Sequence, residues 1–376
     1  MKRNIYLVAL ILLIFFVISF LTNIIGPLVP EIIKDFDLSL TMVAVLPFAF
    51  FIAYGTMSIP AGLLIEHYSE KKIMMSAFLV SFCGALLFAI FSNYLMAIVS
   101  LFLIGSGMAM LQVAINPLLR VAGGEEHFAF NSQLGQLFFG FASFLSPLVY
   151  SYLVINLNSG KLDNFLLSTL AAVVPEELPW VSLYWLFAFI SLAMVFVIQV
   201  SKFPEVNRRE DEKVGMIETL ELLKNPIVWF FFLGIFCYVG TEQGVANWIS
   251  EFLYTYHNFD PQTTGASTVS WFWGMMTAGT LIGLLFLKIM DSRTVLILFS
   301  IGAIICLTLA LFGTGNLSLY AFPAIGFLIA VMWPVIFSLA LNSISENHGS
   351  FSGILVTGIA GGAIVPLIVG SLGDIL

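Results

Sequence analysis

The stretch GLLIEHYSEKK at residues 62–72 returns in altered form as GLLFLKIMDSR at residues 283–293, about 220 residues further along the chain. Each copy begins at the end of a long apolar run and finishes in charged residues. Because the same pattern closes one apolar run in each part of the chain, it predicts an architecture of two similar halves.

Two weaker correspondences have a similar offset. Asn116-Pro117 corresponds to Trp333-Pro334, and Pro147-Leu148-Val149 corresponds to Pro366-Leu367-Ile368. A charged stretch separates the two copies, and its last part has the pattern of an amphipathic helix that lies on the inner membrane surface. We therefore divide the chain into a first helical bundle at residues 1–200, a cytoplasmic linker at 201–225 and a second bundle at 226–376.

The composition shows that lipid is the solvent of this chain. Hydrophobic residues make up 60% of it and charged residues only 10%, and its mean hydropathy of +1.03 exceeds what one soluble core could bury. The sequence predicts an all-α membrane protein. The apolar runs give eleven spans, at residues 5–25, 42–65, 73–91, 95–119, 130–155, 181–200, 226–255, 264–287, 294–312, 318–341 and 351–372.

The basic residues predict how the chain is oriented. Twelve of the 14 Lys and Arg residues lie before the first span or after an even-numbered one: Lys2, Arg3, Lys71, Lys72, Arg120, Lys202, Arg208, Arg209, Lys213, Lys224, Lys288 and Arg293. Only Lys34 and Lys161 lie on the opposite side. By the positive-inside rule the N-terminus is cytoplasmic, and we expect a multi-pass protein of the plasma (inner) membrane. A cleaved signal peptide is the alternative for the first run, but no small-residue cleavage site follows it.

Several classes of function are not indicated by this sequence. The net charge of -8 comes from loop acids and does not suggest a nucleic-acid partner. Three scattered Cys and four isolated His residues give no pattern of metal ligands. Because no nucleophile with a base and no phosphate-binding loop is recognisable either, we do not expect an enzyme, a bound metal or a cofactor.

Several motifs resemble a known family of transporters. The stretch at residues 62–72 is similar to the loop between the second and third helices of the major facilitator superfamily. One branch of it, the fucose, galactose and glucose permeases, is matched by Gln112 to Pro117, Ser182 to Trp185, Tyr238 to Glu242, Trp333 to Ala340, and Gly361 to Pro366. This resemblance implies a fold of twelve helices in two pseudo-symmetric bundles. It also implies transport of a small neutral sugar, usually with a proton or a sodium ion.

The chain departs from that family at three positions. Gly26 stands where the first helix of the family often carries an Asp, and Gln112 stands where the fucose-proton members carry a Glu. The known proton site of those members is therefore replaced. Eleven spans precede Leu376, so we expect that the twelfth helix is absent from this sequence by truncation.

Glu242 is the acid around which the chemistry concentrates. It lies 16 residues after Pro226, which at about 1.5 Å per residue is roughly 24 Å into a helix of about 45 Å. A carboxylate at such depth costs several kcal/mol unless it faces water, pairs with a cation or takes up a proton. We predict that Glu242 couples transport to a cation, with a sodium site near Glu242 and Thr241 as one possibility. The alternative is a neutral acid that joins two helices.

Neutral amides and aromatic rings at membrane depth are the candidates for sugar binding, because hydroxyls need donors and acceptors and a pyranose ring packs on aromatic faces. In the first half they are Asn23, Gln112, Asn116, Gln133 and Gln136. In the second half they are Tyr238, Gln243, Asn247, Trp248, Trp271, Trp273 and Trp333. The alternative role is a hydrogen bond between helices for each amide and simple packing for each Trp.

Two further features concern movement of the helices. Asn116-Pro117 and Trp333-Pro334 are predicted to interrupt their spans, because proline removes a backbone donor. Charged residues next to the repeated stretch are predicted to form a cytoplasmic gate, with solvated loop ends as the alternative: Glu66, Lys71, Lys72, Asp291 and Arg293.

These observations predict a monomeric secondary transporter of a hexose-type sugar that works by alternating access between two bundles. Its expected partners are the sugar, a coupling proton or sodium ion, and membrane lipid. A multidrug or lipid exporter of the same fold is the first alternative, since 37 Phe and 14 Met residues would suit an apolar cavity. A sugar facilitator or sensor without ion coupling is the second. The sugar, the ion and the direction of transport remain open.

Overall fold

The computed structural model describes residues 4–124, 128–160, 164–203, 220–344 and 348–375. Within these ranges the chain is helical and contains no strand. Eleven helical segments of this part are long and apolar enough to cross a membrane, which confirms the predicted all-α membrane fold. The linker lies largely outside the described residues, and with it the first part of the predicted amphipathic helix, residues 216–219.

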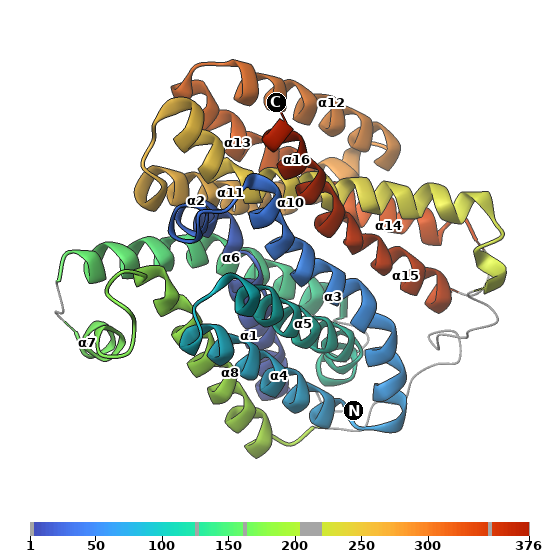
Figure 1. Ribbon diagram of the computed structural model, residues 1–376. Helices are drawn as coiled ribbons and strands as arrows, with labels where there is room; N and C mark the ends of the chain where they lie inside the picture. Colours follow the sequence, from blue (N-terminus) through green and yellow to red (C-terminus); the bar gives the residue numbers. More distant parts are fainter. Residues whose placement is uncertain (1–3, 125–127, 161–163, 204–219, 345–347, 376) are drawn as a thin grey trace.

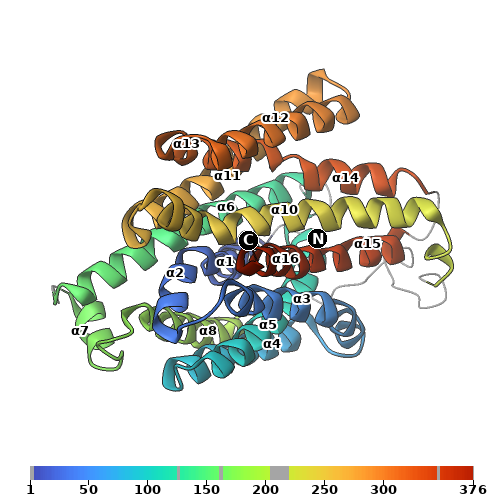
Figure 2. The same cartoon turned by 45° about the horizontal axis from the view of Figure 1, so that its top comes forward.

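The helices of the first half run back and forth between two rims of the molecule. They are α1 (Ile5–Thr22), α2 (Ile25–Phe36), α3 (Leu40–His67), α4 (Glu70–Ile90), α5 (Tyr94–Gly123), α6 (Phe128–Asn158), the short α7 (Phe165–Ala171), the 3₁₀ turn η2 (Pro179–Val181) and α8 (Ser182–Val200). Figure 1 and Figure 2 show α7 at one end of the molecule, away from the main body of helices.

The second half repeats this arrangement with five spans. It consists of α10 (Pro226–His257), the short π-helical segment η4 (Pro261–Gly265), α11 (Ala266–Ile289), α12 (Ser292–Phe312), α13 (Gly315–Ile329), α14 (Met332–Leu341), α15 (His348–Thr357), the 3₁₀ turn η5 (Gly358–Ala360) and α16 (Gly361–Ile375). In both views α12 and α13 lie on the side of the molecule opposite α4 and α8 (Figures 1 and 2).

The first span is longer than the sequence predicts. The apolar run suggests an end near residue 25, but after a break at Asn23 and Ile24 the chain continues as α2 to Phe36. Pro27 lies in the first turn of α2, where the backbone N–H groups have no partner within the helix, so this proline does not prevent the new helix.

One predicted interruption is wrong and another is correct. The helix α5 continues through Asn116-Pro117 without a break. By contrast, α13 and α14 are separated at Ala330 and Val331, directly before Trp333-Pro334. Neighbouring parts of the fold can satisfy the carbonyl that a proline leaves without a partner in its helix. The position of a proline alone therefore does not decide whether the helix breaks.

Each half has its own apolar core. The larger cluster of buried side chains comes almost entirely from residues 7–198, and a second one comes from residues 228–355. The two halves then meet mainly through three helix pairs, α3 with α16, α6 with α11, and α2 with α10. These pairs place α10 and its acid at the boundary between the halves.

The helix pairs between the halves approach very closely at glycines. A Cβ atom at Gly26 of α2 would overlap the Ala246 carbonyl of α10, and one at Gly370 of α16 would overlap the Leu40 carbonyl of α3. Both contacts lie toward the same rim, which is formed by α2, the start of α3, η4 and the end of α16. We call this the closed rim, because the two halves are in backbone contact there.

Candidate functional site

The site is built on the middle of α10. Pro226 starts this helix, and Asn225 caps it by accepting a hydrogen bond of 3.0 Å from the Ile227 N–H. Glu242 lies halfway between this start and His257, as predicted from the sequence, and its side chain is half-buried. The acid therefore lies at mid-helix and at the boundary between the two halves.

Both carboxylate oxygens of Glu242 accept hydrogen bonds from neutral donors. The Tyr238 hydroxyl, one turn earlier, donates to Oε2, and the Gln243 amide donates to Oε1 at 3.0 Å. Tyr238 and Gln243 are themselves buried. In this structure the two side chains thus hold the acid in place, which differs from the direct sugar contacts predicted for them.

An aromatic wall from the broken helix lies next to this group. The Trp333 ring, at the start of α14, is 6.1 Å from the Tyr238 ring, and it stacks on Phe337 at 5.9 Å. The break before Trp333 directs α14 toward α10, which it contacts. Trp333, Tyr238 and Glu242 therefore form a continuous arrangement across two helices.

Glycines fix α10 against α16 behind the acid. A Cβ atom at Gly361 would overlap the Phe236 carbonyl, and one at Gly240 would overlap Val365. Close backbone contact of this kind, which leaves no room for a side chain, sets the rotation of α10 and so the direction of Glu242.

Three of the predicted sugar-binding side chains have a buried N–H without a partner among the described residues. They are the amide of Asn247 on α10, the indole of Trp273 on α11 and the amide of Gln133 on α6. Buried donors are nearly always satisfied in folded proteins, so these three are available to a ligand or to water.

Other predicted residues are already engaged in contacts between helices. The Asn23 amide, at the break between α1 and α2, donates to the Ser143 hydroxyl of α6 at 2.8 Å. The Trp248 indole donates to the Pro366 carbonyl at 3.4 Å, and the exposed Trp271 packs on Phe144 at 5.5 Å. These contacts fit the alternative of interhelical hydrogen bonds and packing.

The remaining amides of the first half are less defined. Gln112 is half-buried on α5, Gln136 is exposed on α6, and the side chain of Asn116 lies outside the described residues. Asn131, which was not among the predicted residues, is fully buried, and neither its amide nitrogen nor its amide oxygen has a hydrogen-bond partner in the described structure. Its spacing to other polar residues along the chain gave no signal, because it is enclosed by the close approach of Gly123 on α5.

Two of the side chains predicted for a cytoplasmic gate, those of Lys71 and Asp291, make contacts within their own half. The Lys71 ammonium donates to the carbonyls of Gln199 and Ser201 at 2.7 and 2.9 Å, which caps the end of α8. Asp291 caps α12 by accepting from the Arg293 N–H at 3.0 Å. Lys72 is exposed, and the Glu66 side chain lies outside the described residues.

The sodium site suggested at Glu242 and Thr241 remains a prediction. The Thr241 side chain is exposed, and its hydroxyl donates to the Cys237 carbonyl of its own helix at 2.9 Å. In the described part of the chain no three His, Cys, Asp or Glu side chains are grouped so that they could hold a metal ion.

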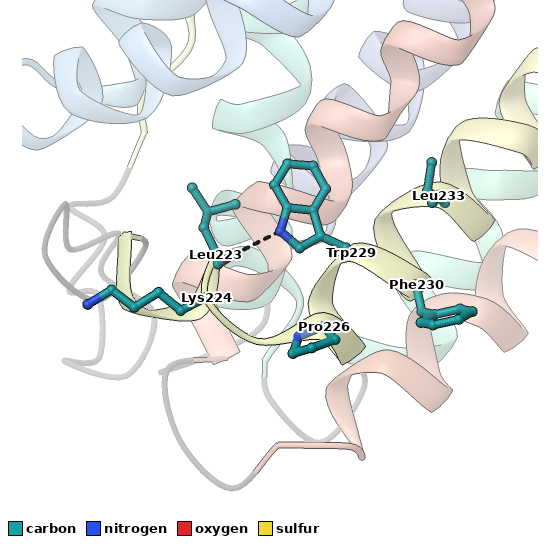
Figure 3. A pocket seen from close by; sticks show the side chains of 6 residues that line it. All are labelled: Leu223, Lys224, Pro226, Trp229, Phe230 and Leu233. Carbon is teal, nitrogen blue, oxygen red and sulfur yellow. Dashed lines mark hydrogen bonds between the residues drawn. The ribbon is translucent and has the colours of Figure 1, made fainter.

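A surface pocket at the start of α10 is separate from this site. It has a volume of about 350 Å³ and is lined by Leu223, Lys224, Pro226, Trp229, Phe230 and Leu233. Figure 3 shows the Trp229 indole directed at the Leu223 carbonyl, to which it donates at 2.8 Å. Leu233 precedes Glu242 by nine residues, or about 13 Å of helix, so the pocket does not reach the acid.

Two helical bundles that meet at a mid-helix acid, beside a broken helix, have the architecture of a secondary transporter. Residues 11–366 match the family described as Major Facilitator Superfamily, and the chain belongs to this family. It is 32% identical to the glucose/galactose transporter of Brucella abortus over 377 residues, covering 96% of this chain and 86% of the relative. It is 26% identical to the L-fucose-proton symporter of Escherichia coli K12, covering 97% and 86%.

Solved structures share this fold. The fucose transporter FucP in its outward conformation superposes with a TM-score of 0.68 at 23% identity, covering 98% of this chain and 92% of the other. A bacterial homologue of the lysosomal transporter Spinster, in an inward-facing conformation, gives 0.81 at 15% identity, covering 100% and 83%.

Proposed function

We propose that the chain is a secondary active transporter that couples the movement of a neutral hexose-type sugar to a cation, by alternating access between its two halves. The observation that carries this proposal is the Glu242 carboxylate at mid-helix, held by Tyr238 and Gln243 at the boundary between the halves. The relatives support the sugar class, because they are named as glucose/galactose and L-fucose-proton transporters.

The polar groups near the boundary fit an uncharged substrate. The unpartnered donors of Asn247, Trp273 and Gln133 can satisfy hydroxyl oxygens, and the Trp333 ring offers a flat apolar face. All Lys and Arg residues lie near helix ends or in the connections, so a phosphorylated sugar would lack a cationic partner at mid-membrane.

Glu242 is proposed as the coupling residue. The acids that the fucose-proton members use are replaced by Gly26 and Gln112, which leaves Glu242 as the carboxylate at mid-depth of the second half. A proton or a sodium ion bound there would compete with the Tyr238 and Gln243 hydrogen bonds. Its binding would thereby change how α10 contacts the first half. The choice of ion is left to experiment.

The orientation follows from the basic residues. We propose a plasma-membrane protein with a cytoplasmic N-terminus, which places the closed rim on the outer side. The substrate would then enter the site in this state from the cytoplasmic side. The assignment of Glu66, Lys71, Lys72, Asp291 and Arg293 to a cytoplasmic gate remains a prediction.

The test is uptake by the purified full chain in proteoliposomes. Labelled glucose, galactose, fucose and N-acetylglucosamine are offered with an imposed proton or sodium gradient. We expect accumulation of at least one sugar with one of the two gradients. No sugar uptake, together with export of a lipophilic cation, would overturn the proposal in favour of an exporter.

A pair of matched variants tests the coupling role. Glu242→Gln should abolish accumulation against a gradient while sugar exchange across the membrane continues. Glu251→Gln is the control, because Glu251 lies nine residues further on the same helix and accepts a hydrogen bond of 2.7 Å from Thr255. Concentrative uptake that survives Glu242→Gln unchanged would rule out coupling at this residue.

A further inference from the structure

Asp374 reaches from the second half to the first at the closed rim. Its two carboxylate oxygens accept hydrogen bonds from the backbone N–H groups of Leu40 and Thr41, both at 2.8 Å, across 334 and 333 positions of sequence. Leu40 and Thr41 are the first two residues of α3. A residue of one bundle thus caps a helix of the other.

The cap completes the start of α3. The first N–H groups of a helix have no partner within it, and Ser39 supplies a partner only to Met42, at 3.2 Å. The Asp374 carboxylate accepts hydrogen bonds from the two preceding N–H groups, those of Leu40 and Thr41. It also places a negative charge at the positive end of the helix dipole, which strengthens both hydrogen bonds.

The two hydrogen bonds of Asp374 join α16 of the second half to α3 of the first half. They exist only while the two halves are together at the closed rim.

The backbones around the contact fit closely. Gly370, one turn before Asp374, faces the Leu40 carbonyl and Ala44 so tightly that a Cβ atom there would overlap both. The approach that this glycine allows brings the end of α16 to the start of α3. Hydrogen bonding by Asp374 and packing at Gly370 thus act at the same place and can be tested separately.

We propose that Asp374 is a latch that holds the closed rim shut by capping α3 across the boundary between the halves. When the halves separate at this rim, water replaces the carboxylate at the two N–H groups. The latch biases the protein toward the closed state and sets part of the free energy needed to open this rim.

The experiment measures the rim directly and does not depend on a substrate. Spin labels are attached at Ser92→Cys, beside α5, and Asn316→Cys, in the first turn of α13, after Cys83, Cys237 and Cys306 are replaced by Ser. Both labels lie at the closed rim: the Tyr94 hydroxyl donates to the Met42 carbonyl at 2.8 Å, and Gly315 lies against His257. Distances between the labels, measured in nanodiscs by double electron–electron resonance, give the ratio of closed to open molecules.

We expect Asp374→Ala to lower the ratio of closed to open molecules about tenfold, which corresponds to about 1.4 kcal/mol. Asp374→Asn keeps one acceptor without the charge and should lie between wild type and Asp374→Ala. Raising the salt concentration should lower the ratio in the wild type but not in Asp374→Ala, because only the wild type has the charged contact.

Two further variants separate the latch from packing and from folding. Asn93→Ala removes a cap at the same rim within one half, where Asn93 accepts from the Met96 N–H at 3.0 Å, and should leave the ratio unchanged. Gly370→Ala should open the rim although Asp374 is retained. If Gly370→Ala opens the rim and Asp374→Ala does not, the rim is closed by packing alone and the latch is refuted. Equal ratios in Asp374→Ala and wild type, with both proteins folded, refute it as well.

Discussion

Tyr238 lies one helical turn before Glu242 on α10, and its hydroxyl donates a hydrogen bond to the Glu242 carboxylate. The same tyrosine ring lies 6.1 Å from Trp333 on the broken helix. Tyr238 therefore contacts both the proposed coupling acid and the aromatic wall proposed for the sugar. A structural change at Glu242 can therefore be transmitted to Trp333 through the Tyr238 side chain, and the reverse is also true.

The first prediction concerns Tyr238→Phe, which keeps the ring beside Trp333 and removes the donor to Glu242. A hydrogen bond to a charged group contributes about 1.5 kcal/mol, so a cation that competes with it should bind about tenfold more tightly. We expect the half-saturating concentration of the coupling cation in uptake assays to fall by that factor. An altered KM for the sugar with unchanged cation dependence would contradict this role.

The second prediction concerns Asn23 and Ser143, which join the break after α1 to α6 by a hydrogen bond of 2.8 Å. In a double-mutant cycle of Asn23→Ala and Ser143→Ala, we expect a coupling energy of about 0.6 to 1.7 kcal/mol in the free energy of unfolding. Both single variants should keep the sugar KM of the wild type. If Asn23→Ala raised the KM for the sugar and Ser143→Ala did not, Asn23 would be a residue of the substrate site.

The third prediction concerns Gly361, where a Cβ atom would overlap the Phe236 carbonyl of α10. Gly361→Ala should push α16 from α10, lower the free energy of unfolding by about 1–3 kcal/mol and impair transport. Gly353→Ala is the matched control, because among the described residues nothing outside the backbone of its own helix lies within 4 Å of a Cβ atom there. Thermal unfolding in detergent and uptake in proteoliposomes measure both effects, and equal behaviour of the two variants would disprove the close contact.

The fourth prediction concerns Gln262 and Glu31, which form a second polar contact between the halves at the closed rim, at 2.9 Å. The single hydrogen bond that Glu31 accepts from Gln262 contributes less than the two hydrogen bonds that Asp374 accepts. Gln262→Ala should therefore lower the ratio of closed to open molecules only about two- to threefold. The spin-label distances at the closed rim provide the measurement, and an effect larger than that of Asp374→Ala would show that this pair dominates.

The sequence was sufficient for the spans because hydrocarbon imposes a length and an apolar composition on each helix. All eleven predicted spans correspond to helical segments long and apolar enough to cross a membrane, and only the first, which continues to Phe36, is markedly longer than predicted. The break before Trp333-Pro334 was also foreseen, whereas the one expected at Asn116-Pro117 is absent. Whether a proline breaks its helix depends on the neighbouring helices, which the local sequence does not describe.

The candidate site was predicted only in part. The mid-helix position of Glu242 followed from its distance to Pro226 along the chain and from the rise of an α-helix. The role of Asn23 did not follow, because its partner Ser143 is 120 positions away. Asn131 was missed because its enclosure depends on how closely α5 and α6 pack at Gly123, which no local pattern of residues shows.

By itself, the sequence determined that this protein is a two-part helical membrane protein with an acid near the middle of its seventh span. Those properties depend on composition and on spacing along one helix. Only the tertiary structure decided which polar groups are engaged and which are free, and that Asp374 caps the helix that begins at Leu40. Contacts between distant segments depend on how whole helices pack, and no local pattern in the chain encodes them.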